Sequence, residues 1–158
     1  MQRMSVSADG TPGNAYSQNA VISADGSTVA FVSAASNLVI SDTNQVADVF
    51  VRDMAGGVIS RVSIASDGAE GNAVSGNLTA PALSADGRYV AFSSLASNLV
   101  DGDTNFQFDV FVHDRQTGQT VRVSVGPDGS QGDWGSSRPA ISGDGRYVAF
   151  TAQRLLCH

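Results

Sequence analysis

Oxygen-bearing side chains are grouped most densely between residues 101 and 109, which read Asp-Gly-Asp-Thr-Asn-Phe-Gln-Phe-Asp. Asp101, Asp103 and Asn105 occupy alternate positions, and Asp109 adds a fourth ligand group. Calcium binds six to eight oxygen atoms, and the EF-hand loop begins with acidic or amide side chains at this spacing. We therefore predict a calcium site formed by these four residues. The alternative is that the same side chains hydrogen-bond to nearby backbone and only shape the loop.

The match to an EF-hand loop is partial. Phe106 replaces the glycine at the sixth position of that loop, and Val112 replaces the acid at its twelfth. An earlier copy at 40–48 reads Ile-Ser-Asp-Thr-Asn-Gln-Val-Ala-Asp and lacks the leading acid. The metal prediction is therefore confined to the later copy, and calcium is the one cofactor that the sequence suggests.

A second candidate site lies at the third of three similar loops. The loops at 9–17, 67–75 and 128–136 share an Asp-Gly pair, then Gly-Asn or Gly-Asp, and a final Ser. These are ordinary turn residues. Trp134 and Arg138 occur only at the third loop, and tryptophan with arginine is typical of binding hot spots. We predict ligand contacts at these two residues, with a contact between neighbouring sheets as the alternative.

Residues suited to catalysis are scarce. The two histidines are His113, inside a repeated strand motif, and His158, the last residue. No Gly-x-Ser-x-Gly motif of the serine hydrolases occurs, and a single Glu among 15 acids leaves no evident acid–base pair of carboxylates. The one cysteine, Cys157, cannot form an internal disulfide. We predict a protein without catalytic residues.

These candidates are placed by an internal repeat. Ser-Ala-Asp-Gly at 23–26 returns at 84–87 and, as Ser-Gly-Asp-Gly, at 142–145, with spacings of 61 and 58 residues. Asp-Val-Phe-Val-Arg-Asp at 48–53 returns as Asp-Val-Phe-Val-His-Asp at 109–114. Self-similarity at such a period indicates a repeat architecture, so the repeat takes priority over any local interpretation.

Each repeat unit predicts four short strands, called a to d in chain order. In the second unit these are residues 81–84, 89–94, 109–114 and 120–125, and the Asp-Gly pair between the first two is a strong hairpin signal. Strands b and c are apolar on both faces, so each sheet needs a neighbour on both sides. Four-stranded sheets that pack radially as the blades of a β-propeller meet this need.

Charged residues also recur in the repeat. Arg61 and Arg122 occupy one position of strand d, with Arg3 as an earlier copy, and Asp53 and Asp114 end strand c. We predict cross-strand ion pairs of Arg61 with Asp53 and of Arg122 with Asp114. Exposed pairs of this kind contribute about 0.2–1 kcal/mol, so they would set register more than stability.

The block Ser-x-Asp-Gly-Arg-Tyr-Val-Ala-Phe, followed by Asp-Val-Phe-Val-x-Asp, resembles the TolB-type (WD40-like) β-propeller repeat over about residues 3–152. The resemblance implies an all-β propeller of four-stranded blades. It also implies a periplasmic or extracellular location, although residues 1–5 begin no apolar signal sequence. Such blades serve both binding proteins and enzymes, so the fold alone does not decide function.

The repeats supply about 2.5–3 blades: strand d at 3–7, blades at 20–64 and 79–125, a partial blade at 138–152, and a non-repeat tail at 153–158. A propeller closes with four or more blades, and an open arc exposes apolar faces and a strand edge. We expect two copies to form a homodimer with a six-bladed ring, in which residues 3–7 of one copy join the partial blade of the other. The alternative is a fragment of a larger propeller protein.

The b–c and d–a loops are long, whereas the a–b and c–d turns are short. Binding residues concentrate on loops that a rigid scaffold holds. We therefore predict a non-catalytic binding or scaffold module whose ligand, a protein, peptide or glycan, docks on the long-loop face. The alternative is a hydrolase or lyase with its site at the mouth of the central channel.

Composition limits the partners. The chain has nine basic and 15 acidic side chains, a net charge of −6 and no basic cluster, which disfavours nucleic acid. No apolar run approaches the roughly 18 residues that cross a bilayer. We therefore predict neither a nucleic-acid partner nor membrane insertion.

Overall fold

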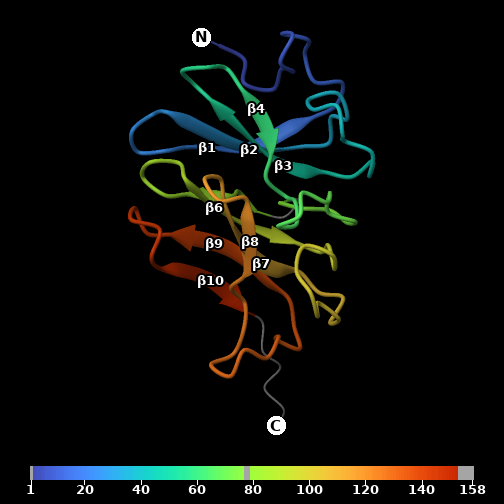
Figure 1. The fold of residues 1–158 in the computed structure, drawn as a ribbon, viewed down its shortest axis with the longest axis vertical. Helices are drawn as coiled ribbons and strands as arrows, with labels where there is room; N and C mark the ends of the chain where they lie inside the picture. The colour runs from blue at the N-terminus through green and yellow to red at the C-terminus, as the bar shows by residue number, and fades with distance from the viewer. Residues whose placement is uncertain (1, 77–78, 153–158) are drawn as a thin grey trace.

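The computed structural model describes residues 2–76 and 79–152, which form ten β-strands in three antiparallel sheets and no helix. The sheets follow one another along the chain, from the first at the top of Figure 1 to the third at the bottom. The predicted all-β class is confirmed. Over the same ranges, no helical segment has the length and hydrophobicity that a bilayer crossing requires.

The first two sheets have the same topology, with their strands in chain order. The first contains β1 (Ser17–Ile22), β2 (Thr28–Ser33), β3 (Asp48–Asp53) and β4 (Ile59–Arg61). The second contains β5 (Ala82–Leu83), β6 (Tyr89–Ser94), β7 (Asp109–Asp114) and β8 (Gln119–Arg122). The third contains β9 (Ser136–Ile141) and β10 (Val148–Ala152), which correspond to strands a and b of the repeat.

Two paired phenylalanines lie on one face of each complete sheet. The rings of Phe31 and Phe50 stack with their centroids 6.0 Å apart, and Phe92 and Phe111 repeat this at 6.0 Å. Each pair lies directly opposite across strands b and c. All four side chains are buried. The Phe of each strand motif therefore anchors the register of the two central strands.

Neighbouring sheets pack through unlike faces. Small side chains on one face of the first sheet, such as Ala30 and Val49, pack with Phe92 and Phe111 of the second sheet. The phenylalanines of the first sheet lie on its opposite face, where Met4 packs beside them. The small-residue face of the first sheet thus packs against the phenylalanine face of the second.

The turns between strands a and b also join the sheets. Gly87 has a φ of +67°, and a Cβ at this position would lie 2.5 Å from Thr28 Oγ1 of the preceding sheet. A Cβ at Gly145 would likewise overlap the ring of Tyr89 in the preceding sheet. Glycine is needed here both for its left-handed backbone and for the close approach of the next sheet.

The small-residue face of the third sheet is exposed. Ala149 is exposed to solvent, whereas its counterparts Ala30 and Ala91 are completely buried. Tyr147, which begins the b-strand segment of this sheet, is 67% exposed, whereas the equivalent Thr28 is 3% exposed. The difference arises because no described residues cover this face.

Residues 3–7, predicted as a strand d, form an isolated bridge between Val6 and Pro12 in place of a strand. In the complete sheets strand d pairs only with strand c, as β4 does with β3 and β8 with β7. The segment 3–7 has no c-type strand beside it within the described ranges, so it has no neighbour with which to form a ladder.

Candidate functional site

The long b–c loops end in buried aspartates. Asp48 and Asp109 are the first residues of β3 and β7, and both are completely buried. Ser63 Oγ donates a hydrogen bond to Asp48 Oδ1 at 2.5 Å, and Asn44 Nδ2 donates to its Oδ2 at 2.8 Å. Each carboxylate therefore ties the end of its loop to strand d and to the loop itself.

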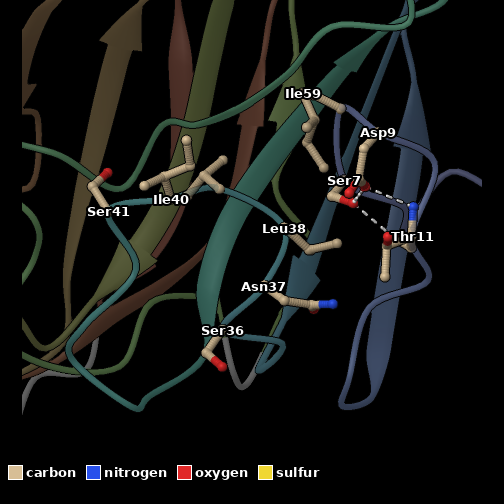
Figure 2. Close-up of a pocket in the computed structure, with 11 residues that line it drawn as sticks. Ser7, Asp9, Thr11, Ser36, Asn37, Leu38, Ile40, Ser41 and Ile59 are labelled. Atoms are coloured by element: carbon tan, nitrogen blue, oxygen red, sulfur yellow. Dashed lines mark hydrogen bonds between the residues drawn. The ribbon is translucent and has the colours of Figure 1, made fainter.

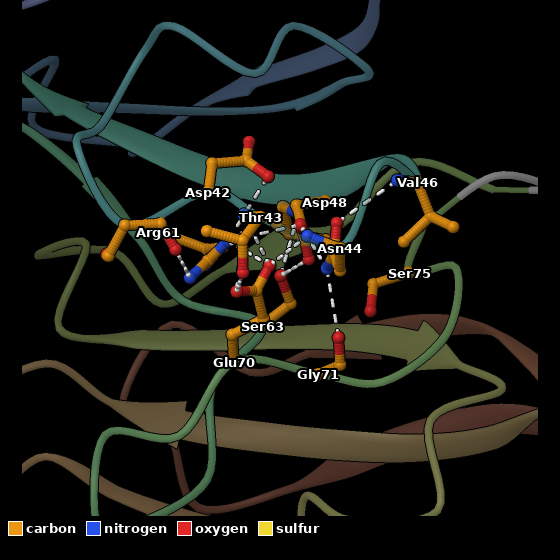
Figure 3. A network of polar contacts seen from close by, with 12 residues as sticks. Asp42, Thr43, Asn44, Val46, Asp48, Arg61, Ser63, Glu70, Gly71 and Ser75 are labelled. Atoms are coloured by element: carbon orange, nitrogen blue, oxygen red, sulfur yellow. Dashed lines mark hydrogen bonds and ion pairs between the residues drawn. The ribbon is translucent and has the colours of Figure 1, made fainter.

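Arg61 is buried, and its guanidinium lies among three acids, of which Asp48 is also buried (Figure 3). Its Nη1 is 3.1 Å from Glu70 Oε1, 3.4 Å from Asp42 Oδ1 and 3.5 Å from Asp48 Oδ2. Its Nη2 donates to the carbonyl oxygen of Ser41 at 2.9 Å. Three carboxylates thus share one guanidinium. We call Asp42, Asp48, Arg61 and Glu70 the first charged cluster.

Glu70 connects the following d–a loop to the b–c loop. Its Oε1 accepts hydrogen bonds from the backbone amides of Thr43 at 2.9 Å and Asn44 at 2.6 Å. Its Oε2 accepts from Thr43 Oγ1 at 2.7 Å. The Asn44 side chain also donates to the carbonyl oxygen of Gly71 at 2.9 Å. The first charged cluster therefore holds two long loops together at one end of the sheet.

The second sheet repeats this arrangement with one charge fewer. Arg122 Nη1 lies 3.2 Å from Asp103 Oδ1 and 3.7 Å from Asp109 Oδ2, and it donates to Gln131 Oε1 at 2.9 Å. Gln131 stands where Glu70 stands in the first sheet, nine residues after the arginine. The second charged cluster, Asp103, Asp109, Arg122 and Gln131, therefore contains two carboxylates.

Burial disfavours ionisation in the first charged cluster. It raises the pKa of Asp48 to about 6, although two hydrogen bonds and the charge of Arg61 oppose the shift. Burial also raises the pKa of Asp42 against the attraction of Arg61. Burial acts on Glu70 too, but hydrogen bonds from residues 43–44 outweigh it and lower the pKa of this carboxyl. Asp48 is thus the group that takes up a proton as the pH falls through 6.

The predicted ion pairs of Arg61 with Asp53 and of Arg122 with Asp114 are wrong. Arg61 lies opposite the third residue of β3, close to the start of that strand, whereas Asp53 is at its far end. The antiparallel register therefore directs the arginine to the aspartate that begins strand c. Asp114 instead accepts two hydrogen bonds from Arg88, at 2.9 and 2.7 Å.

The structure brings three of the four predicted calcium ligands together. Asp103 and Asp109 lie against Arg122, and Asn105 Nδ2 donates to Asp109 Oδ2 at 3.0 Å. Asp101 is exposed, and it forms no hydrogen bond or ion pair with the described residues. The guanidinium already supplies positive charge to these acids. Calcium binding at this loop stays a prediction.

The first charged cluster groups more acidic oxygens than the loop that the sequence favoured. One ligand oxygen each from Asp42, Asp48 and Glu70 lies within 4.8 Å of the others. Sequence reasoning missed Glu70, because it lies in a different loop from the Asp-x-Asn motif. The available signal was its spacing, since Glu70 and Gln131 follow the repeated arginines by the same number of residues.

Trp134 and Arg138 do not share a pocket. Trp134 is 44% exposed and lines a hollow of about 360 Å³ together with Phe150 and Ala152 of the third sheet. Arg138 is exposed at a bulge of β9 with a φ of +56°, which is unusual for arginine, and it lies outside the lining of that hollow. Ligand binding by this pair stays a prediction.

A larger hollow of about 630 Å³ opens between the d–a loop before β1 and the b–c loop before β3 (Figure 2). Ile40 and Ile59 give it an apolar lining. The corresponding hollow beside the second sheet, of about 330 Å³, has Asp101 and Thr120 at these positions. Both hollows lie between the long loops, where the sequence predicted a binding face, and only the first suits an apolar group.

No protein-family model and no curated protein matches the chain. Solved structures do match it. The structure of putative TolB from Agrobacterium tumefaciens superposes with a TM-score of 0.52 at 19% identity, over 84% of this chain and 36% of that chain. Tricorn protease superposes with a TM-score of 0.52 at 11% identity, over 86% of this chain and 11% of that one. TolB from Acinetobacter baumannii gives 0.43 at 18% identity, over 86% and 37%.

The chain thus spans about a third of the length of the two TolB chains. The superpositions at a TM-score of 0.52 show that its sheets have a TolB-like propeller fold. The fold that the repeat motifs predicted is confirmed.

Proposed function

We propose that this chain is a non-catalytic propeller module that assembles with a second copy of itself into a six-bladed ring and binds a protein, peptide or glycan on its long-loop face. The TolB-like fold supports a role in protein interaction. The observation that carries the proposal is the exposed small-residue face of the third sheet.

That face is buried wherever a following sheet is present. Ala30 and Ala91 are completely buried, whereas Ala149 is exposed. The turn glycine of each following sheet also contacts the start of strand b in the preceding one, but Gly26 has no atom within 4 Å of its Cβ position, and Tyr147 is exposed. The third sheet lacks a following sheet over its small-residue face, and the first sheet of a second copy would take that place. Two copies joined head to tail would make this contact twice and close a ring.

A non-catalytic role is supported by how the buried acids are used. The carboxylates of both charged clusters contact arginine, and those of Asp48, Asp109 and Glu70 also accept loop or strand hydrogen bonds. Carboxylates held by these contacts fix the loops in place, although Asp42 Oδ1 lies within ion-pair distance of Arg61 without a hydrogen bond. The likeness to tricorn protease, at 11% identity, concerns the fold alone. A hydrolase or lyase at the channel mouth remains the alternative.

Light scattering on the purified chain tests self-assembly. The wild type is expected to have the mass of two chains at micromolar concentration. Ala149→Lys places a charge on the face that the second copy would bury, so it should shift the mass to one chain while leaving the circular dichroism spectrum unchanged. Gln116→Lys, in the exposed turn between β7 and β8, adds the same charge and should leave the mass at two chains.

A mass of one chain for the wild type at every concentration would contradict self-assembly. It would favour the alternative that further blades of a longer propeller chain cover the same face.

The hollow beside Ile40 is the proposed place for a peptide side chain on the long-loop face. Ile40 is fully exposed, and with Val39 and Ile59 it gives the hollow an apolar lining that suits an apolar side chain of a peptide. Peptides selected on the wild type from a displayed library should lose binding to Ile40→Asp and keep binding to Asp101→Asn, the change at the equivalent position. Selected peptides that bind Ile40→Asp as well as the wild type would contradict this site.

A further inference from the structure

We propose that the third blade of the ring takes up one additional β-strand, which begins with aspartate and carries phenylalanine two residues later, and that Arg3 and Ser5 bind that aspartate. The inference rests on the proposed ring, since this strand would lie between β10 of one copy and residues 3–6 of the next. Its partner class is an extended segment of the Asp-Val-Phe-Val type.

The complete blades show how such a strand is recognised. In the first sheet Phe50 of strand c lies opposite Phe31 of strand b on one side and opposite Arg61 of strand d on the other. The second sheet has the same three-strand register. A phenylalanine of strand c is therefore flanked by a phenylalanine and an arginine in both blades.

The aspartate two residues before this phenylalanine is held by an Arg-x-Ser pair on strand d. Asp48 accepts a hydrogen bond from Ser63 Oγ at 2.5 Å and lies 3.5 Å from Arg61 Nη1. The second sheet repeats both contacts, at 2.5 and 3.7 Å, with Asp109, Ser124 and Arg122. The same three residue types thus join strands c and d in each complete blade.

Arg3 and Ser5 are a third copy of the Arg-x-Ser pair without its aspartate. Arg3 is exposed, and its Nε donates to Ser5 Oγ at 3.2 Å. Among the described residues, no carboxylate lies within ion-pair distance of Arg3. Its own d–a loop has Pro12 where the first sheet has Glu70, so that loop offers no acid at this position. The pair therefore has both groups needed to bind an aspartate from another strand.

The strand on the other side of the proposed additional strand, β10, also carries the residue that the complete blades have at this position. Phe150 occupies the position of Phe31 and Phe92, but it is only half-buried, and β10 pairs with β9 alone within the described ranges. The two complete blades place a strand-c phenylalanine against this position. A strand that pairs with β10 on the edge opposite β9 would add backbone hydrogen bonds, as in β-strand addition. Side-chain contacts to Phe150 and Arg3 would set its register.

A synthetic peptide with the sequence of residues 105–116, which includes a complete strand c, tests the site in trans. Binding of the labelled peptide is measured by fluorescence anisotropy. The wild type should bind this peptide about tenfold or more tightly than a peptide carrying Asp109→Ala, because a charge-assisted hydrogen bond is lost. The protein variant with both Arg3→Ala and Ser5→Ala should bind the two peptides equally, whereas Arg146→Ala, which also removes an exposed arginine, should keep the preference.

The outcomes separate the strand site from self-assembly. Aspartate-dependent binding by a protein that light scattering finds as a single chain would contradict self-assembly and overturn the site as proposed, because β10 of one copy and residues 3–6 of the next would not come together. A two-chain assembly that binds neither peptide, or binds both equally, would overturn the strand site and leave self-assembly standing. A preference that persists when both Arg3 and Ser5 are replaced by alanine would likewise overturn the roles assigned to these two residues.

Discussion

Replacing Arg61 with alanine tests whether its guanidinium holds the first charged cluster together. The change leaves the carboxylates of Asp42, Asp48 and Glu70 without their shared cation. Removing one partner of a buried ion pair costs about 3–5 kcal/mol, because an uncompensated charge stays buried. We expect the free energy of unfolding of Arg61→Ala to fall by this amount at pH 8.

The second blade provides the matched control. Arg122 has two carboxylate partners, at 3.2 and 3.7 Å, whereas Arg61 has three, at 3.1, 3.4 and 3.5 Å. Coulomb attraction falls as the inverse of distance, so Arg122 has roughly two-thirds of the attraction of Arg61. We therefore expect Arg122→Ala to lower the free energy of unfolding by about 2–3 kcal/mol.

The pH dependence gives a second, independent readout. The pKa of Asp48 is raised to about 6 with Arg61 in place, and removing that positive charge raises it further. A carboxyl whose folded-state pKa exceeds its unfolded value stabilises the fold at low pH, and this contribution is lost as the pH rises through the folded pKa. The difference between wild type and Arg61→Ala should therefore narrow from pH 8 to pH 5.

Urea unfolding followed by circular dichroism, at intervals between pH 5 and pH 8, measures both effects. Equal costs for Arg61→Ala and Arg122→Ala would refute the charge argument. A cost of Arg61→Ala that does not change with pH would refute the role given to Asp48.

Three further predictions concern packing and metal binding. Gly87→Ala should lower the free energy of unfolding by about 2–4 kcal/mol, because it combines a left-handed backbone with a close contact to the preceding sheet. Gly118 has a φ of +75° and open space around it, so Gly118→Ala should lower the free energy of unfolding by about 1 kcal/mol. Equal costs for the two variants would show that the contact with the preceding sheet is unimportant. Phe92→Ala should cost about 3–5 kcal/mol in urea unfolding, and Phe150→Ala should cost less because its side chain is partly exposed; similar costs would contradict the incomplete packing of the third sheet. Millimolar calcium should raise the melting temperature measured by differential scanning fluorimetry, and Asp103→Ala should abolish the rise; no rise in the wild type would contradict the calcium site.

The sheets could be predicted from the sequence because their signals are local and repeated. Asp86-Gly87 sets a hairpin turn, and the Phe of each strand motif marks the centre of strands b and c. Three copies of the hairpin and strand-b motifs and two of the strand-c motif leave little freedom for another fold. Strand ends differ from the prediction: β8 spans Gln119–Arg122, whereas the sequence predicts a strand over residues 120–125. Backbone pairing at such ends depends on neighbouring loops.

The charged clusters could be predicted only in part. Asp103, Asn105 and Asp109 were recognised as one group because they lie within one short loop. The role of Arg61 was missed, because its partner depends on the register between strands c and d rather than on which residues end those strands. Glu70 was missed because it comes from the next loop along the chain. Contacts between loops are not encoded in any one segment.

The direct test of the central claim is the arrangement of sheets in the assembled protein, determined by electron cryo-microscopy. The account predicts a closed ring of six sheets, in which Tyr147 of each copy packs against the Gly26 turn of the other. An isolated arc of three sheets, or an open filament of such arcs, would contradict it.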